Sequence, residues 1–402
     1  MSELSSVSLP VPGVRLACVA AGIRKADRPD VTLIEICEGA TAAAVFTKNV
    51  FCAAPVTLCR SHLASAMPRL LVINAGNANA GTGEQGFVDA RAVCSEAAHR
   101  LHCATEQVLP FSTGVIGQRL PAEKIIDVLD LALGQLNPDA WDAAARGIMT
   151  TDTVPKCFST QIVTEAATYT VTGISKGAGM IKPDMATMLA FIATDACVSD
   201  THLQALVRDI ADRTFNRITI DGDTSTNDSC VLVATGCAPG PALTPDSAQW
   251  TAFRNGVERV FAELARAIVR DGEGATKLVT VKVSGGLTEA DCLRAAYAVA
   301  ESPLVKTALF ANDPNWGRIL AAVGRSGATD LRLHEISIAV GGVPIVAEGE
   351  PVPGYDEADV ASVMKGAEYE ISITIGASAI EVAVLTCDFS YDYVRINAEY
   401  RS

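Results

Sequence analysis

One threonine in this sequence stands where cleavage of the chain would turn it into a nucleophile. Thr187 follows a loop rich in glycine and interrupted by proline, and it precedes an apolar run. A threonine hydroxyl is a weak nucleophile, but cleavage of the Ala186–Thr187 bond would leave a free α-amino group beside it as a base. Such an amine has a reference pKa of about 7.7–8.0, so a useful fraction is neutral near pH 7. The arrangement therefore suggests nucleophilic catalysis by an N-terminal threonine.

The same residues allow a simpler interpretation, in which Thr187 only opens a buried strand. The loop before it favours strain, because Gly177 and Gly179 permit unusual backbone dihedrals. Pro183 also pushes Lys182 toward extended geometry. Spacing alone leaves both interpretations open.

Six short motifs occur in order along the chain. They are residues 72–80 (VINAGNANA), 112–117 (STGVIG), 149–153 (MTTDT), 176–191 (KGAGMIKPDMATMLAF), 221–228 (DGDTSTND) and 313–318 (DPNWGR), followed by Asn397 near the C-terminus. Together they resemble the ornithine acetyltransferase family, the glutamate N-acetyltransferases of arginine biosynthesis. The resemblance covers nearly the whole chain. It implies self-cleavage between Ala186 and Thr187 into an α chain of residues 1–186 and a β chain of residues 187–402.

The resemblance also implies roles for individual side chains. Thr187 would be the nucleophile, and Thr113 with Gly114 would form the oxyanion hole that acyl transfer needs. The substrate-binding residues that the family implies are Thr153, Lys176, Thr187, Glu273, Asn397 and Ser402. Thr151 is a weaker option for the role of Thr153.

Without the resemblance, most of these residues have ordinary explanations. Residues 112–114 could form a simple turn, Lys176 could be a solvated surface lysine, and Asn397 and Ser402 could belong to a frayed end. Glu273 differs, because it lies between two glycines just past a long predicted helix. A carboxylate is electrostatically unfavourable at a helix C-terminus. The resemblance implies that it binds substrate, where it could hold the cationic side-chain amine of ornithine.

The implied reaction is acetyl transfer by a ping-pong mechanism. Thr187 would take the acetyl group from N2-acetylornithine, release ornithine and pass the group to glutamate. No cofactor is implied, and acetyl-CoA stays open as a further donor. Two α and two β chains are expected to associate in the cytoplasm, as is typical of the family. Two other interpretations remain: a self-processing aminopeptidase or amidase that gives the acyl group to water, and an uncleaved binding or structural protein.

Other motifs fail on their spacing. Residues 221–228 resemble a calcium loop, but they lack the glycine and the glutamate that an EF-hand needs at its sixth and twelfth positions. His99 and His102 have too few further ligands nearby for a zinc site, so no metal is expected. Residues 173–177 match G-x-S-x-G, yet a loop rather than a helix should follow them. No nucleotide-binding fingerprint occurs.

Composition narrows the class of protein. The net charge of −14 argues against a nucleic-acid partner. The twelve cysteines form no C-x-x-C pair, which favours buried free thiols in a reducing compartment. No signal peptide is expected at the N-terminus. The sequence has no run of about 18 uncharged apolar residues, so no membrane span is predicted.

The elements that position these residues follow from hydrophobic periodicity. Strands are predicted over residues 31–37, 42–46, 56–59, 70–74, 170–174, 187–194, 229–234, 276–283, 336–340, 343–347, 370–375 and 380–386. Helices are predicted over residues 87–101 and 245–270 and from residues 121, 199 and 288. The expected fold class is α/β, a layered sandwich of mixed sheets covered by helices. We expect a catalytic domain over residues 1–285 and a smaller α/β domain over residues 286–402.

Overall fold

The computed structural model describes residues 8–23, 28–165, 167–182 and 188–399. Two compact units form. The first takes the described residues of 1–177, 183–216 and 224–268, and the second takes 178–182, 217–223 and those of 269–402. This division differs from the expected boundary at residue 285. The reason is that the strand Leu278–Ser284 is hydrogen-bonded on both sides to strands of the second unit, so the chain joins that unit before the strand begins.

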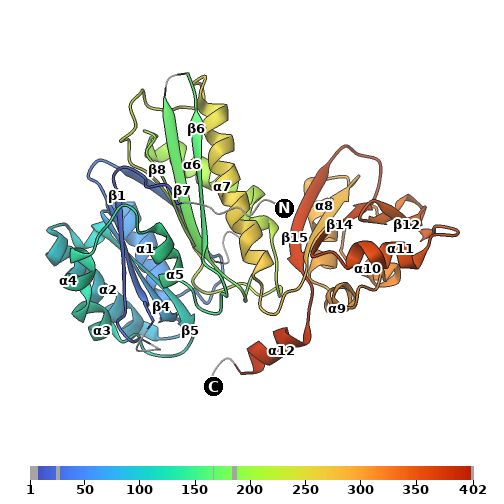
Figure 1. Cartoon of the computed structure of the whole chain (residues 1–402), viewed down its shortest axis with the longest axis horizontal. Coiled ribbons are helices and arrows are strands. Elements are labelled where there is room, and N and C mark those ends of the chain that lie inside the picture. Colours follow the sequence, from blue (N-terminus) through green and yellow to red (C-terminus); the bar gives the residue numbers. More distant parts are fainter. Residues whose placement is uncertain (1–7, 24–27, 166, 183–187, 400–402) are drawn as a thin grey trace. The chain divides into compact units, whose positions relative to one another are not determined.

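Two sheets packed face to face build the first unit (Figure 1). One sheet has the strand order β1–β2–β4–β5 and the other β3–β9–β8–β7–β6. The strands are β1 (Val14–Val19), β2 (Val31–Ile36), β3 (Thr41–Phe46), β4 (Leu70–Asn77), β5 (Val108–Val115), β6 (Lys156–Val163), β7 (Thr168–Lys176), β8 (Leu189–Thr194) and β9 (Ser229–Ala234). The pairs β4–β5 and β8–β9 are parallel and the other pairs antiparallel. The predicted α/β class with mixed sheets is confirmed.

Strand β4 shows how the layers arise from the sequence. Leu71 and Ile73 belong to the core between the two sheets, whereas Leu70 and Val72 belong to the core on the opposite face. Successive side chains of a strand point to opposite faces, so a fully apolar strand needs cover on both. The helices that contribute to the second of these cores are α1 (Ala54–Ser65), α2 (Gly83–Leu101), α3 (Ala122–Asp127) and α4 (Leu129–Gly134).

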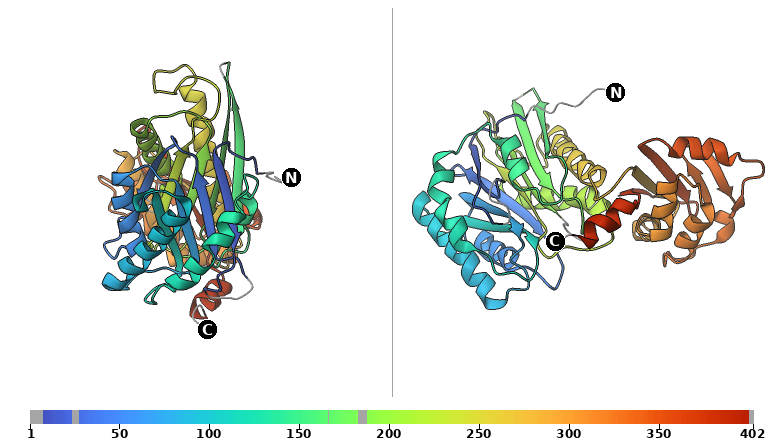
Figure 2. Two further views of the ribbon diagram at one scale, coloured as in Figure 1. Left: turned by 90° about the vertical axis from the view of Figure 1, so that its left-hand side faces the viewer. Right: turned by 60° about the horizontal axis from the view of Figure 1, so that its bottom comes forward.

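Two further helices cover the outer face of the second sheet. They are α6 (Asp200–Arg213) and α7 (Trp250–Arg270). Helix α7 packs on β7, where Val260 and Leu264 lie so close to Gly173 that a side chain there would touch both. The right-hand view in Figure 2 shows α7, in yellow, and the helices of residues 83–134, in cyan, on opposite sides of the two sheets. The unit is therefore a four-layer sandwich of helices, two sheets and helices.

The strand predicted over residues 56–59 is wrong. These residues lie in helix α1 (Ala54–Ser65), which has a proline in its first turn. Val56, Cys59 and His62 are buried at intervals of three, the spacing of one helix face. A run of four apolar residues cannot separate a strand from a buried helix. The other helix of this unit, α5 (Trp141–Gly147), was not predicted.

Several local predictions are confirmed. Ser199 accepts a hydrogen bond from the His202 N–H and caps α6. The helix predicted over 87–101 is α2, which begins slightly earlier. The helix predicted from residue 121 is two short helices that meet at Val128.

The second unit contains one sheet with the order β13–β12–β11–β14–β10–β15. Its strands are β10 (Leu278–Ser284), β11 (Ser337–Val340), β12 (Val343–Ala347), β13 (Glu350–Pro351), β14 (Glu368–Thr374) and β15 (Glu381–Cys387). Its helices are α8 (Glu289–Ala300), α9 (Pro303–Ala311), α10 (Trp316–Gly324), α11 (Glu357–Met364) and α12 (Tyr391–Ala398). Val279, Val281 and Val283 of β10 enter the core with residues of α8 to α11. Thr288 and Asp291 form the predicted capping box at the start of α8.

None of the helices in the described residues is long and apolar enough to cross a membrane. All twelve cysteines are free thiols. Cys94, Cys230 and Cys292 are buried as expected, whereas Cys18 is half-buried and Cys197 and Cys237 are exposed.

Candidate active site

Thr113 and Gly114 lie at the carboxyl end of β5, beside the carboxyl end of its parallel neighbour β4. Ala75 of β4 pairs with Thr113 of β5, and Gly76 pairs with Gly114 just before the register is interrupted. Gly114 has φ of +133°, and a Cβ there would lie 2.2 Å from the carbonyl carbon of Gly76. Only glycine permits this backbone dihedral together with so close an approach. The predicted oxyanion pair is therefore built into the sheet rather than into a free turn.

The asparagines of the 72–80 motif fix the chain that follows β4. Asn74 accepts a hydrogen bond from the Ser112 hydroxyl at 2.6 Å and donates to the carbonyl of Asn77 at 2.8 Å. Asn77 in turn accepts from the N–H of Asn79 at 2.7 Å. Short amide side chains bond to nearby backbone and replace regular ladder bonds. The motif therefore shapes the rim of the Thr113–Gly114 strand end.

Asn227 ties the second sheet to the same place. It precedes β9, and its Nδ2 donates to the carbonyls of Ala78 at 2.6 Å and Ser112 at 2.9 Å. The Thr226 hydroxyl donates to the Asn227 Oδ1 at 2.5 Å. Because Asn227 lies just before β9 of one sheet and Ser112 lies in β5 of the other, these bonds connect the two sheets at this end of their strands.

Lys176 reaches Thr113 from the second sheet. It is the last residue of β7, is only 9% exposed, and donates from Nζ to the Thr113 Oγ1 at 3.1 Å. The alternative of a solvated surface lysine is thereby excluded. Two residues of the predicted site, 63 positions apart in the sequence, are in direct contact.

Asp152 and Lys156 form a buried ion pair beside Lys176 that the sequence analysis missed. The Asp152 Oδ1 accepts from the Lys156 Nζ at 2.6 Å and from the Gly177 N–H at 2.7 Å, while Oδ2 accepts from the Thr150 N–H at 2.9 Å. The side chains of Asp152 and Lys156 are 0% and 1% exposed. The signal that could have found them is an aspartate inside the 149–153 motif, four residues before a lysine.

Burial and charge act in opposite directions on Asp152. Burial by itself would raise the pKa of this carboxyl group, but the charges of Lys176 and Lys156 and the Gly177 N–H outweigh it and lower the pKa to about 2. The ordinary value is about 3.9. The carboxylate is therefore favoured by its surroundings although it is buried.

We expect the protein to lose stability in acid through Asp152. Since the folded pKa lies below the unfolded value, this carboxylate stabilises the fold fully above about pH 4, and the contribution disappears as pH falls through about 2. The shift corresponds to a free energy of unfolding on the order of 2 kcal/mol. Urea unfolding of the wild type and of Asp152→Asn across this pH range measures it. Parallel plots of stability against pH for the two proteins would contradict the expectation.

Two more of the predicted residues of the first unit lie on one loop. Thr153 is exposed on the loop before β6, and Thr151 is half-buried. Ala186 and Thr187 lie outside the described residues, as does Ser402 at the C-terminus. Their roles stay predictions.

Glu273 and Asn397 meet in the second unit. The Asn397 Nδ2, on helix α12, donates to the Glu273 Oε2 at 2.8 Å, although 124 positions separate them in the sequence. Glu273 is 8% exposed, and its N–H donates to the Ala178 carbonyl at 2.8 Å. A Cβ on Gly179 would lie 2.5 Å from the Glu273 carboxylate. Gly179 therefore leaves the space that the Glu273 carboxylate occupies, and Asn397 belongs to a helix rather than to a frayed end.

Asp221, also in the second unit, binds the backbone of the loop that contains Gly179. Its two carboxylate oxygens accept from the N–H groups of Met180 at 2.6 Å and Ile181 at 2.8 Å. Burial raises the pKa of Asp221, against the effect of these hydrogen bonds. The 221–228 motif thus supplies an anchor for the loop that leads to Thr187.

The other motifs have structural explanations. Ser175 of the G-x-S-x-G match is fully buried within β7, and the strand continues into a loop, so the hydrolase elbow is excluded. In the 313–318 motif, Asn315 accepts from the Arg318 N–H at 3.1 Å and caps α10. Within the residues that the structure describes, no group of three or more histidine, cysteine, aspartate or glutamate side chains could hold a metal ion.

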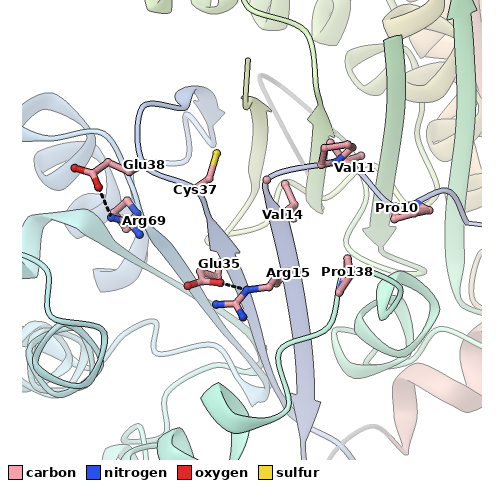
Figure 3. A pocket seen from close by; sticks show the side chains of 11 residues that line it. Pro10, Val11, Val14, Arg15, Glu35, Cys37, Glu38, Arg69 and Pro138 are labelled. Atoms are coloured by element: carbon pink, nitrogen blue, oxygen red, sulfur yellow. Dashed lines mark hydrogen bonds and ion pairs between the residues drawn. The ribbon is translucent and has the colours of Figure 1, made fainter. Parts of the chain in front are cut away.

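A surface pocket of about 540 Å³ lies elsewhere in the first unit (Figure 3). Arg69, which lines it, stands six residues before Ala75 in the sequence, roughly 20 Å along an extended strand. Its arginines are paired within the pocket, Arg15 with Glu35 at 2.5 Å and Arg69 with Glu38 at 3.9 Å. The pocket is therefore separate from the Thr113–Lys176 contact.

Comparison with known proteins gives one consistent answer. The model of the ArgJ family matches residues 15–402. The arginine biosynthesis bifunctional protein ArgJ of Pseudomonas syringae pv. tomato is 53% identical over 394 residues, which are 98% of this chain and 97% of that protein. The protein of the same name from Methylococcus capsulatus is 51% identical over 401 residues, 100% of this chain and 98% of that protein.

A solved structure agrees with the sequence relatives. The crystal structure of the arginine biosynthesis bifunctional protein ArgJ from Bacillus halodurans is 40% identical, with a TM-score of 0.50, over 51% of this chain and 96% of that chain. The family predicted from the six motifs is confirmed, and with it an enzyme of acetyl transfer in arginine biosynthesis: the chain belongs to the ArgJ family.

Proposed function

We propose that this enzyme moves the acetyl group of N2-acetylornithine to glutamate through an acetyl ester on Thr187. The observation that carries the proposal is the buried contact between Lys176 and Thr113 beside Gly114. Strand β8 begins at Leu189, which pairs with Lys176 across β7 and β8. The described chain thus resumes next to the proposed oxyanion hole, one residue after the proposed nucleophile.

The proposed mechanism uses Thr187 twice. Its hydroxyl first attacks the Ala186 carbonyl, which moves the Ala186 acyl group from the Thr187 nitrogen to its oxygen and frees the amine. Water then hydrolyses this ester, which separates the two chains and restores the Thr187 hydroxyl. In each turnover the amine takes the hydroxyl proton, and the oxygen attacks the acetyl carbonyl of the donor. Thr113 and Gly114 donate to the oxyanion, and the protonated amine returns its proton to the leaving ornithine. Glutamate then attacks the acetyl ester by the reverse sequence.

The substrate contacts of the proposal come from named side chains. Glu273, oriented by Asn397, would bind the cationic side-chain amine of ornithine. Carboxylates held by charge-assisted hydrogen bonds suit a cationic group. The further proposed contacts are Thr153, Lys176 and Ser402.

Intact mass and label exchange test the proposal. Two fragments that divide between Ala186 and Thr187 are expected in the freshly purified enzyme. Labelled ornithine should then exchange into N2-acetylornithine without glutamate, because a ping-pong intermediate releases ornithine first. One unbroken mass would contradict the mechanism. Acetate formed faster than N-acetylglutamate would instead favour the hydrolase.

A second donor is proposed from the name of the relatives. Both are called bifunctional, which favours a second activity at this site. We propose that acetyl-CoA also acetylates Thr187. Formation of N-acetylglutamate from acetyl-CoA and glutamate alone would support this, and dependence on N2-acetylornithine would contradict it.

We further propose that the enzyme is cytoplasmic and consists of two α and two β chains. Native mass spectrometry would measure the number of chains.

Gly179→Ala should weaken substrate binding with little effect on stability. The added methyl group would displace only the end of the flexible Glu273 side chain. Loss of one charged hydrogen bond costs about 1.5–3 kcal/mol, so the KM for N2-acetylornithine should rise about 10-fold or more. The matched control is Gly134→Ala, where a Cβ meets nothing within 4 Å. Equal KM values in the two variants would argue against Glu273 as a substrate contact.

A further inference from the structure

The hydrogen bond between Lys176 and Thr113 has only one possible direction. An ammonium group has three donors and no acceptor, so the Thr113 Oγ1 must be the acceptor of this 3.1 Å contact. Among the described residues, this is the only hydrogen bond that the Thr113 side chain makes. The hydroxyl hydrogen is therefore left to donate to something else. A hydroxyl without such a partner could turn and present a lone pair instead.

The Lys176 side chain is in turn part of a buried ionic cluster. Asp152 binds Lys156 directly at 2.6 Å and also holds the Gly177 N–H, next to Lys176 in the chain. Its carboxyl pKa is lowered by the charge of Lys176 as well as by that of Lys156. All three residues are less than 10% exposed, so their charges interact with little screening by water. Two ammonium groups and one carboxylate leave one net positive charge beside Thr113.

We propose that Asp152 and Lys156 are positioning residues that hold Lys176 against Thr113, so that the Thr113 hydroxyl is preset as a hydrogen-bond donor to the oxyanion. The inference rests on the oxyanion role proposed for Thr113 above. A donor that is already oriented needs no rearrangement when charge develops on the intermediate. Lys176 thereby gains a role that acts through Thr113, besides its proposed contact to substrate.

A double-mutant cycle between Thr113→Val and Lys176→Met tests the link. The two processed chains are coexpressed from separate reading frames, so that self-cleavage does not limit the assay, and the wild-type pair is the reference. Thr113→Val should lower kcat about 100-fold, as loss of one oxyanion donor does. Lys176→Met should lower kcat about 10-fold, and the double variant should be no slower than Thr113→Val alone.

Three results of these kinetic measurements would overturn the inference. Multiplying losses would show that Lys176 acts independently of Thr113 and would overturn the inference. A higher KM with unchanged kcat in Lys176→Met would do the same, since it would reflect substrate binding alone. If Thr113→Val leaves kcat unchanged, the oxyanion role itself fails and the inference falls with it.

A second variant separates positioning from simple folding. Asp152→Asn combined with Lys156→Met removes one charge of each sign, so the cluster keeps its net charge and Lys156 is not left buried without its carboxylate. It should lower kcat about 10-fold in the presence of Thr113 and have no effect in the Thr113→Val background. Equal losses in both backgrounds would overturn the proposal. Lys124→Met is the control, because this exposed lysine donates to the Gly22 carbonyl far outside the cluster and should leave kcat unchanged.

Discussion

Thr187→Ala is expected to leave the chain in one piece and without acetyl transfer. Alanine has no hydroxyl to attack the Ala186 carbonyl, and an uncleaved chain has no free amine at residue 187. Loss of the nucleophile of a catalytic unit lowers kcat by at least about 10⁴-fold. Intact mass of the purified variant and the rate of N-acetylglutamate formation measure the two effects.

Two further variants test whether the loss depends on the hydroxyl of Thr187. Thr187→Ser keeps a hydroxyl and should still cleave, more slowly, because serine lacks the branch that restricts χ1. Thr201→Ala changes an exposed threonine whose hydroxyl donates to the neighbouring Asp200 carboxylate, and it should cleave and react like the wild type. Acetyl transfer by an uncleaved Thr187→Ala chain would show that another residue carries the acetyl group.

Gly114→Ala should damage both the fold and the activity. The new Cβ would lie 2.2 Å from the backbone carbonyl carbon of Gly76, and no side-chain rotation can relieve this overlap. Positive φ adds strain of about 1–3 kcal/mol and overpacking adds a similar amount, so the free energy of unfolding should fall by about 3 kcal/mol or more. The oxyanion donors would shift at the same time, and kcat should drop about 100-fold. Urea unfolding and initial rates measure these losses.

Gly117→Ala separates strain from overlap. Gly117 also has positive φ, +81°, but a Cβ there meets nothing within 4 Å. We expect it to cost only about 1 kcal/mol through backbone strain. Equal costs at the two glycines would mean that the approach of β4 to β5 at Gly114 contributes nothing.

Helices and strands could be predicted from the sequence where the hydrophobic pattern is long or a capping residue marks the start of a helix. The alternation of Val279, Val281 and Val283 predicted β10, and Ser199 predicted the start of α6. The run 56–59 misled because four residues fit one face of a helix as well as a strand, and the burial of His62 shows only in the folded helix α1. Signals of this kind act over one or two turns, so they need a long segment to be decisive.

The sequence by itself determined the family and most of the candidate residues, because each motif is local and its letters are visible without a fold. Only the tertiary structure decided which of them touch. Lys176 contacts Thr113 across 63 positions of the sequence, and Asn397 contacts Glu273 across 124. Asp152 and Lys156 became candidates only because the folded structure shows them as a buried ion pair. Such contacts depend on strand order and on how sheets pack, which periodicity does not encode. Pairing of distant residues is therefore decided when the whole core forms, and not by the segments that contain them.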